Sequence, residues 1–188
     1  MKYLKQAWLV IVLSLGFGAA LAAVQSSLGP KIAANKLAET MRQVPLLVPG
    51  TAADKTTAIT VEDTVVYRAQ NASGKLAGWV IPARGQGFAD TIELLIGLDA
   101  SGETITGLFV LAQKETPGLG DFITGKWREQ FAGKKTLAPL TVVKKMPGTV
   151  ADSEIAAVTG ATISSESVKN IVNAAVEKFR GKLPADAQ

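Results

Sequence analysis

The amino-acid sequence contains no cysteine and no histidine among its 188 residues. Without these side chains the protein has no disulfides, no thiolate or imidazole zinc sites, no cysteine-held iron–sulfur clusters and no histidine-ligated haem. Any electron that it carries must therefore reside on an organic cofactor. The chain also lacks internal repeats, runs of like charge and a dinucleotide-binding glycine pattern after a strand, which argues against a self-sufficient dehydrogenase.

A large charge of one sign is missing as well, because 20 Lys and Arg residues face 16 Asp and Glu residues, for a net charge of +4. The two signs are interleaved along the chain, and no basic cluster contains interspersed aromatic residues. This pattern argues against nucleic acid as a partner. Hydrophobic residues make up 47% of the chain, which suffices for one folded domain with an appendage.

Apolar residues dominate the N-terminus, where the uncharged stretch 7–24 follows Lys2 and Lys5. Its length of about 18 residues just reaches what an α-helix needs to cross a bilayer. Two interpretations remain open: a retained anchor, or a signal peptide cleaved near the small residues at 20–22. We favour the anchor, with residues 1–28 as the transmembrane segment. The positive-inside rule then predicts a cytoplasmic N-terminus and a domain on the outer side of the membrane.

The segment 29–60 is predicted to connect the anchor to the domain. Residues 30–42 have apolar side chains at helical spacing, which predicts an amphipathic helix. Prolines and glycine after Arg42 are expected to end it, and the Thr-rich and Ala-rich composition that follows indicates a linker or surface loop over 44–60.

The remaining residues, 61–188, alternate short β-branched and aromatic runs with turn residues. The predicted strands are 65–69, 77–81, 92–98 and 105–111, which pair as two hairpins, with a further short strand over 140–143. Apolar spacing predicts helices over 121–131 and from Ser164 to a terminating Gly181. Trp79 and Trp127 are predicted to lie in the core. The sequence therefore predicts an α+β domain, an antiparallel sheet with helices packed on one face, preceded by a single N-terminal transmembrane helix.

The start of the last helix is the first segment whose residues could bind a ligand. Small residues allow close backbone approach there, and several hydroxyls follow; the residues are Thr159, Gly160, Ala161, Thr162 and Ser164. Exposed amides and the positive end of the helix dipole favour a phosphate, with Lys169 as a further positive charge. The alternative is that Thr162 or Ser164 simply caps the helix.

The second such segment is the run from Glu115 to Asp121. Pro117 fixes one backbone angle, whereas Gly118 and Gly120 permit conformations that other residues avoid. The run suits a tight loop that lies flat beside a ring. It is equally typical of a turn that joins a strand to a helix.

Taken together, the two runs resemble one family. Glu115-Thr116-Pro117-Gly118-Leu119-Gly120 and Thr159-Gly160-Ala161-Thr162 are similar to the FMN-binding domain of the Rnf complex G subunit and of the C subunit of the sodium-pumping NADH:quinone reductase. The glycine-rich run 85–88 and the aromatic residues Trp127 and Phe131 lie at matching offsets. The resemblance extends from about residue 78 to residue 179 and is closer to the shorter Rnf protein.

This resemblance implies that FMN is bonded covalently, through its phosphate, to the oxygen of Thr162. It also implies that the run 115–120 lines the flavin. Glu115 then bonds either the ring edge or loop backbone, and Thr116 donates either to a flavin carbonyl or to backbone. Leu119 packs either against the ring or into the core.

The resemblance further implies a redox subunit of an Rnf-type complex, which couples ferredoxin and NAD to sodium or proton translocation and is not a complete enzyme alone. Its partners would be the other membrane and peripheral subunits, and a flavin transferase that uses FAD. The domain would lie on the outer side of the bacterial inner membrane. Two other interpretations remain open: a stand-alone extracytoplasmic flavinylated carrier, and a binding or scaffold domain without flavin.

Two residues depart from the family pattern. Ala156 stands where an aspartate usually precedes the small residues of the second run, with Asp152 and Glu154 nearby. Gln113 stands where a histidine often precedes the first run. The first departure concerns recognition by the transferase, and the second concerns the surroundings of the flavin.

Overall fold

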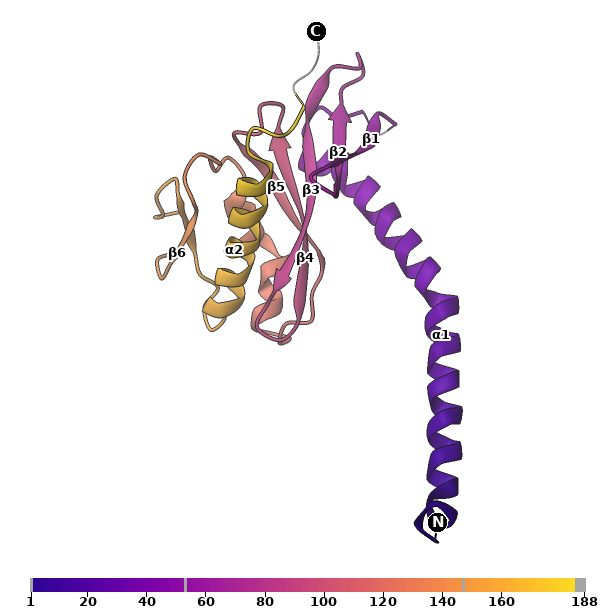
Figure 1. The fold of residues 1–188 in the computed structure, drawn as a ribbon. Helices are drawn as coiled ribbons and strands as arrows, with labels where there is room; N and C mark the ends of the chain where they lie inside the picture. Colours follow the sequence, from indigo (N-terminus) through magenta and orange to yellow (C-terminus); the bar gives the residue numbers. More distant parts are fainter. Residues whose placement is uncertain (1, 53, 147, 185–188) are drawn as a thin grey trace. The chain divides into compact units, whose positions relative to one another are not determined.

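The structure is a computed structural model that describes residues 2–52, 54–146 and 148–184 (Figure 1). In chain order the elements are α1 (Lys2–Leu47), β1 (Thr56–Val61), β2 (Thr64–Gln70), β3 (Leu76–Gln86), β4 (Thr91–Asp99), β5 (Ile105–Ala112), the 3-10 helices η1 (Gly120–Thr124) and η2 (Lys126–Phe131), β6 (Thr141–Val143), β7 (Glu154–Ala156) and α2 (Thr162–Phe179). The chain forms two compact units, Met1–Glu39 and Thr40–Gln188.

The first unit is the apolar part of α1. A window of this helix with a mean hydropathy of 2.3 is long and apolar enough to cross a membrane, and it is the one such candidate in the described part of the chain. Large apolar side chains along it are exposed, including Phe17 at 69% and Leu21 at 70%. Such a surface suits lipid, so the helix fits a membrane anchor.

The prediction of a linker or surface loop over 44–60 is wrong, because regular secondary structure occupies both ends of this segment. α1 continues to Leu47, through Pro45 in its last turn, and β1 occupies Thr56–Val61. The helix persists because Val44 and Leu47 are buried against the sheet, which offsets the backbone disruption that proline causes. Sequence patterning missed β1 because its threonines and alanine give weak hydrophobic alternation.

Five antiparallel strands form the main sheet, in the order β1-β2-β3-β4-β5. Both predicted hairpins are confirmed, β2 with β3 and β4 with β5. The unexpected strand β1 joins β2 through Glu62 and Asp63, whose φ angles of 49° and 58° match the paired positive values of a type I′ turn.

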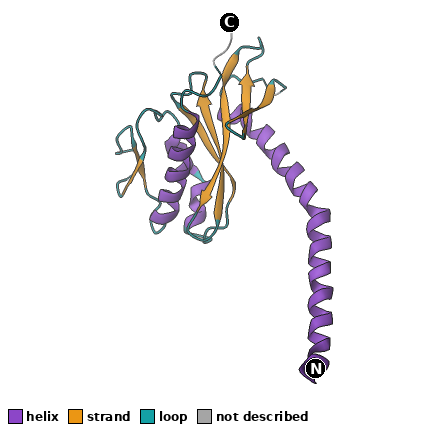
Figure 2. Ribbon diagram, viewed as in Figure 1, coloured by secondary structure: helices purple, strands orange, loops and turns teal. Residues whose placement is uncertain are grey.

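The sheet is covered on both faces. Alternate residues of β3 and β4 contribute to two separate apolar clusters, as the pleat requires. One cluster holds Trp79 and Leu94 and lies under α2, as predicted, with the helix running alongside the sheet (Figure 2). The other holds Val80 and Leu95 and lies under the end of α1. That second layer was not expected from the sequence.

Glycines let the end of α1 lie directly on the sheet. Gly97 and Gly107 are cross-strand partners on β4 and β5. A Cβ at Gly97 would lie 2.6 Å from the carbonyl oxygen of Leu47, and one at Gly107 would lie 3.1 Å from a methyl of the same leucine. Thr106 donates its hydroxyl to the Leu47 carbonyl over 2.5 Å. Residues 40–47 are therefore part of the domain.

Three other elements differ from the sequence prediction. The helix expected over 121–131 is two 3-10 helices that meet at Gly125, whose extended backbone interrupts any longer helix. The predicted strand over 140–143 is present as β6, but it pairs in parallel with β7 in a separate two-stranded sheet. α2 begins at Thr162 and not at Ser164; its expected end is confirmed, with Gly181 at a φ of 68°.

Asp99 closes the turn between β4 and β5. One of its oxygens accepts hydrogen bonds from the Ser101 hydroxyl at 3.0 Å and from the amides of Glu103 and Thr104 at 2.9 and 3.2 Å. Burial favours the neutral acid, but these donors outweigh it and hold the pKa of the Asp99 carboxyl below its usual value.

Replacing this carboxylate, as in Asp99→Ala, is expected to destabilise the domain by about 1–2 kcal/mol at neutral pH because three donors lose their acceptor. Since the folded pKa lies below the unfolded value of about 3.9, this stabilisation is fully present above the unfolded pKa and is lost as the pH falls through the folded one. The difference in free energy of unfolding between wild type and variant should therefore be largest at neutral pH and should shrink as the pH falls below the unfolded pKa. A difference that stays constant with pH would contradict this assignment.

Candidate cofactor site

Glu115 joins three segments at one end of the domain. Its side chain is buried, with 4% exposed. One oxygen accepts a hydrogen bond from the backbone amide of Ala89 at 3.1 Å, and the other accepts the hydroxyl of Ser164 in the first turn of α2. The Glu115 amide donates to the side chain of Gln113. The carboxylate thus bonds loop backbone, one of the two expected partners, and also brings the two sequence runs together.

Two glycines are required around this carboxylate because no side chain fits. A Cβ at Gly120 would lie 2.8 Å from the Cβ of Glu115 and 2.9 Å from the Ser164 hydroxyl. A Cβ at Gly87 would lie 2.5 Å from a Glu115 oxygen. The buried carboxylate of Glu115 is therefore surrounded closely by three segments: the loop before β4, the loop after β5 and the start of α2.

Each run also contains a tight turn with glycine in the third position. In the first, the Leu119 amide donates to the Thr116 carbonyl over 3.2 Å, and Gly118 has a φ of 73°. In the second, Ala161 donates to Val158 over 3.0 Å. Proline followed by glycine is the usual sequence of a type II turn, so the tight loop predicted at Pro117 is confirmed.

The two turns touch each other. Gly160, with a φ of 80°, has a methyl of Leu119 3.0 Å from where its Cβ would lie. Leu119 is 46% exposed, so it is not a core residue. The side chains of Thr116, Pro117 and Thr159 are exposed as well. The runs thus form one exposed apolar and hydroxyl-bearing surface over a buried carboxylate.

The capping interpretation of the helix start is wrong. The N-cap residue of α2 is Ala161, and no side chain caps it. Thr162 is the first helical residue, half-buried, and its hydroxyl has no hydrogen-bond partner in the described part of the chain. Ser164 gives its hydroxyl to Glu115 instead of to helix amides. The first amides of α2 are therefore left available to an anion.

Lys169 lies two turns further along α2. Its ammonium forms an ion pair with Glu166 at 2.8 Å and donates to the Asn170 side chain at 2.7 Å. Both partners lie on α2, and Lys169 forms no ion pair or side-chain hydrogen bond with the two runs in the part of the chain that the structure describes.

Ala156, which departs from the family pattern, is fully buried at the end of β7. Its amide donates to the Gln130 side chain at 2.9 Å, and its carbonyl accepts from the Trp127 ring nitrogen at 2.6 Å. Trp79 has no exposed surface and is a core residue as predicted, whereas Trp127 is half-buried and packs edge to face against the buried Phe131 at the border of the core.

Sequence reasoning missed several groups that hold this site. The sequence did not predict that Glu115 contacts the Ala89 amide and the Gly87 backbone, because these residues lie far from Glu115 along the chain. Ser165 is fully buried, accepts the Val158 amide and donates to the Ala161 carbonyl, which fixes the second turn. Two exposed apolar residues beside the runs, Phe122 at 55% and Ile163 at 58%, carried no signal in the sequence.

Replacement of Glu115 by alanine is expected to destabilise the fold by about 2–4 kcal/mol, because the buried Ser164 hydroxyl and the Ala89 amide both lose their acceptor. Glu115→Gln is the matched control, since it keeps the size and one acceptor oxygen and should lose less. Denaturant unfolding of the two variants measures the difference. Equal losses would mean that packing, and not hydrogen bonding, fixes this position.

The geometry defines an α+β domain in which an uncapped helix N-terminus, a free threonine hydroxyl and two glycine turns converge at one end of the sheet. Such an arrangement suits a ligand with an anionic group and a flat apolar part. Residues 87–177 match the family of FMN-binding domains.

Among curated proteins, the chain is similar to the G subunit of the Na(+)-translocating ferredoxin:NAD(+) oxidoreductase complex of Acetobacterium woodii. The identity is 36% over 111 residues, which cover 57% of this chain and 52% of that protein. The chain is 40% identical over 113 residues to the G subunit of the proton-translocating ferredoxin:NAD(+) oxidoreductase complex of Clostridium ljungdahlii, covering 60% of this chain and 58% of that protein. The chain spans about half the length of the curated relatives it matches.

Among solved structures, the fold is similar to that of NqrC from Shewanella oneidensis. The TM-score is 0.58 with 25% sequence identity, over 70% of this chain and 69% of that one. This likeness agrees with the expected fold class, an antiparallel sheet with α2 on one face and an apolar helix at the N-terminus.

Proposed function

We propose that this chain is a membrane-anchored electron-transfer subunit that carries FMN covalently, as a phosphoester of Thr162. It acts within an Rnf-type complex that couples electron transfer between ferredoxin and NAD to the translocation of sodium ions or protons. The chain is a redox subunit and not a complete enzyme. Its family and the names of its relatives support this proposal.

The observation that carries the proposal is the free hydroxyl of Thr162 at the first residue of α2. It belongs to a helix start that no side chain caps, so a phosphate on this oxygen lies beside unpaired amides and the positive end of the helix dipole. The Thr162 side chain is half-buried, and its hydroxyl bonds no other residue in the described part of the chain, so no intramolecular bond has to break when the phosphoester forms.

The residues around Thr162 fit the other parts of FMN. The exposed side chains of Leu119, Phe122 and Ile163 offer apolar surface for a flat ring, and Thr116 offers an exposed hydroxyl to a ring carbonyl. Thr159, Gly160 and Ala161 let backbone approach the phosphate. Glu115, Gly120 and Ser164 would act indirectly, since they hold the two turns in place.

FMN supplies the redox chemistry when bound, as a carrier of one or two electrons. The chain contributes position and electrostatics. The first amides of α2 would bind the phosphate and the turn at Pro117 would orient the ring. The carboxylate of Glu115 joins the segments of both turns, since it accepts from Ala89 and from Ser164. No side chain of the chain is assigned as an acid or base.

Attachment of FMN requires a separate transferase that uses FAD. In the attachment step the Thr162 oxygen forms a bond to the FMN phosphorus of FAD, the pyrophosphate bond breaks, AMP leaves, and the hydroxyl proton is released. The apolar helix α1 anchors the product in the inner membrane of a bacterium, with the N-terminus in the cytoplasm and the flavin domain on the outer side.

Intact mass of the denatured protein, purified from membranes of a host that expresses the transferase, tests this proposal. Denaturation removes flavin that is not covalently bound, so any added mass is bonded. The expected result is the mass of one FMN phosphoester, mapped by peptide fragmentation to the peptide that contains Thr162. An unmodified chain beside an active transferase would sink the proposal, and Ala156 would be the first residue to change.

A further inference from the structure

Glu115 carries a buried charge that no cation pairs with. Its side chain is 4% exposed, and both oxygens accept hydrogen bonds, one from the Ala89 amide at 3.1 Å and the other from the Ser164 hydroxyl. A carboxyl group whose two oxygens accept and do not donate is in its ionised form. Within the described residues, Glu115 forms no ion pair. A buried charge without an opposite charge lowers stability relative to a neutral group of the same shape.

Two lysines, one beside Glu115 in the sequence and one on α2, are bound to other acids. Lys114 directly precedes Glu115 and donates to Asp90 at 2.7 Å. Lys169 pairs with Glu166 on α2 at 2.8 Å. Each of these cations is therefore offset by its own carboxylate, and neither forms an ion pair with Glu115.

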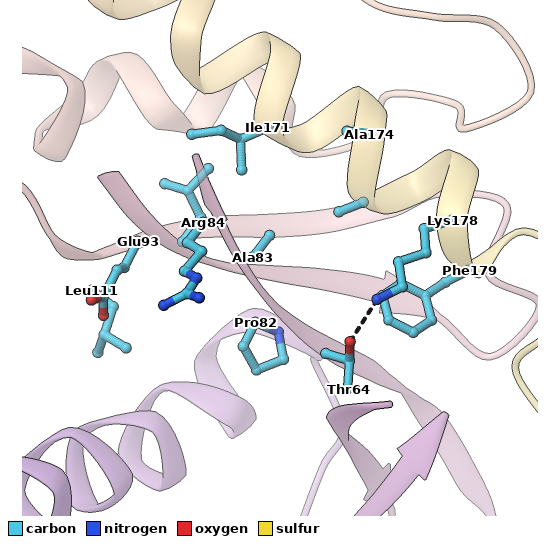
Figure 3. Close-up of a pocket in the computed structure, with 12 residues that line it drawn as sticks. Thr64, Pro82, Ala83, Arg84, Glu93, Leu111, Ile171, Ala174, Lys178 and Phe179 are labelled. Carbon is cyan, nitrogen blue, oxygen red and sulfur yellow. Dashed lines mark hydrogen bonds between the residues drawn. The ribbon is translucent and has the colours of Figure 1, made fainter. Parts of the chain in front are cut away.

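Two further cations, one on β3 and one on α2, surround a different space. Arg84 and Lys178 line a cavity of about 510 Å³, and Glu115 is not among the residues that line it (Figure 3). Lys178 donates there to the Thr64 hydroxyl at 2.7 Å. The negative charge of Glu115 therefore has no ion-pair partner at the end of the sheet where the two glycine turns meet.

A neutral side chain of the same size could make the same two contacts. The side-chain amide of glutamine has an oxygen that would accept from the Ala89 N–H and an NH2 group that would donate to the Ser164 oxygen. A neutral group also avoids the desolvation that a buried carboxylate requires. The hydrogen bonds that hold the turns therefore do not explain why position 115 carries a charge.

The charge lies within the framework of the proposed flavin site. Glu115 bonds Ser164, two residues after Thr162, and a Cβ at Gly120 would lie 3.1 Å from a Glu115 oxygen. We propose that the Glu115 carboxylate lowers the reduction potential of the flavin, because each electron that the ring accepts adds negative charge near a buried negative charge. Glu115 acts through this charge, and not as an acid or a base. The inference rests on the proposed function, since it requires a flavin beside Thr162.

Midpoint potentials of the flavin-loaded full chain test this inference. Each variant is purified from membranes of a host that expresses the transferase and is titrated with dithionite, which supplies the electrons, while the flavin absorbance is recorded. Glu115→Gln removes the charge and keeps the size of the side chain. We expect its equilibrium constant for flavin reduction to be at least about tenfold larger, which is about 59 mV for a one-electron step. The helix dipole and the phosphate are the same in both proteins, so the difference measures the carboxylate charge.

Two further variants separate charge from geometry. Glu115→Asp keeps the charge but shortens the side chain, so its equilibrium constant should stay within about threefold of wild type although the fold is less stable. Glu166→Gln is the matched control, because it removes an acid from α2 that is 41% exposed and paired with Lys169. It should change the constant by less than about threefold. The effect of Glu115→Gln should persist at high salt, because a buried charge is screened little.

Equal potentials for wild type and Glu115→Gln would overturn the inference. So would a folded Glu115→Asp chain whose equilibrium constant rises about tenfold, because geometry and not charge would then set the potential. The mass of each denatured chain is measured on the same sample. A chain that carries FMN on Thr162 with equal potentials refutes the effect of Glu115 alone. A chain that binds flavin without a covalent bond and shows the shift refutes the proposed phosphoester alone.

Discussion

A Thr162→Ala chain is expected to carry no flavin after denaturation, whatever the transferase supplied. The phosphoester has one oxygen on which to form, and the variant removes it. Folding should not change, because the Thr162 hydroxyl has no hydrogen-bond partner in the described part of the chain and surface substitutions of this kind shift stability by only about 0.5 kcal/mol or less. Intact mass and thermal unfolding of the same preparation measure both effects.

Thr159→Ala is the matched control for this variant. Thr159 carries an exposed hydroxyl and is separated from Thr162 by only two small residues, Gly160 and Ala161. It should keep the full mass of the attached FMN. If flavin were lost from both variants, the loop as a whole, and not one oxygen, would be what the transferase requires. If flavin stayed on Thr162→Ala, the covalent assignment would be wrong.

Removal of residues 1–50 is expected to prevent the domain from folding as a soluble protein. The end of α1 and the residue that follows it bury Val44, Leu47 and Val48, with at most 3% of each exposed. Burial of such side chains contributes about 1.5–3 kcal/mol each, so their loss removes about 5–9 kcal/mol. This is comparable with the whole stability of an ordinary domain, about 5–15 kcal/mol.

A chain that starts at Asn35 is the control for this truncation. It lacks the apolar stretch 7–24 but keeps the turns of α1 that pack on the sheet. It should show the circular dichroism of an α+β protein and a cooperative melt, whereas a chain that starts at Thr51 should aggregate. Equal melting midpoints for the two chains would mean that the end of α1 is dispensable.

The sequence predicted the parts of the fold that depend on local patterns. The two hairpins and α2 follow from alternation and helical spacing over neighbouring residues. The end of α1 could not be predicted, since Pro45 and Pro49 indicate a break, and only contact with Gly97 and Gly107 explains why the helix continues. β7 is three residues long and pairs only with β6, so it carries almost no pattern of its own.

For the candidate site, too, the sequence predicted the local features and not the contacts between distant residues. The residue types around Thr162 and Pro117 were visible as two runs, and the tight turn at Pro117 follows from its sequence. The pairing of Glu115 with Ser164 was not visible, because it joins residues 49 positions apart. The capping interpretation failed for the same reason: Ser164 is an ordinary capping residue by composition, and a distant carboxylate takes its hydroxyl.

The contact of Leu47 with Gly97 and Gly107 also limits how this protein can vary. Most surfaces of a domain tolerate many side chains, but a carbonyl 2.6 Å from the Cβ position leaves room for a hydrogen atom and nothing larger. In a saturation library, alleles at the Gly97 codon should therefore be recovered almost exclusively as glycine, whereas Gly107, whose Cβ would lie 3.1 Å from a leucine methyl, should also be recovered as alanine. A mutation at this contact would lower the amount of folded protein that reaches the membrane, and it would leave the residues around Thr162 unchanged.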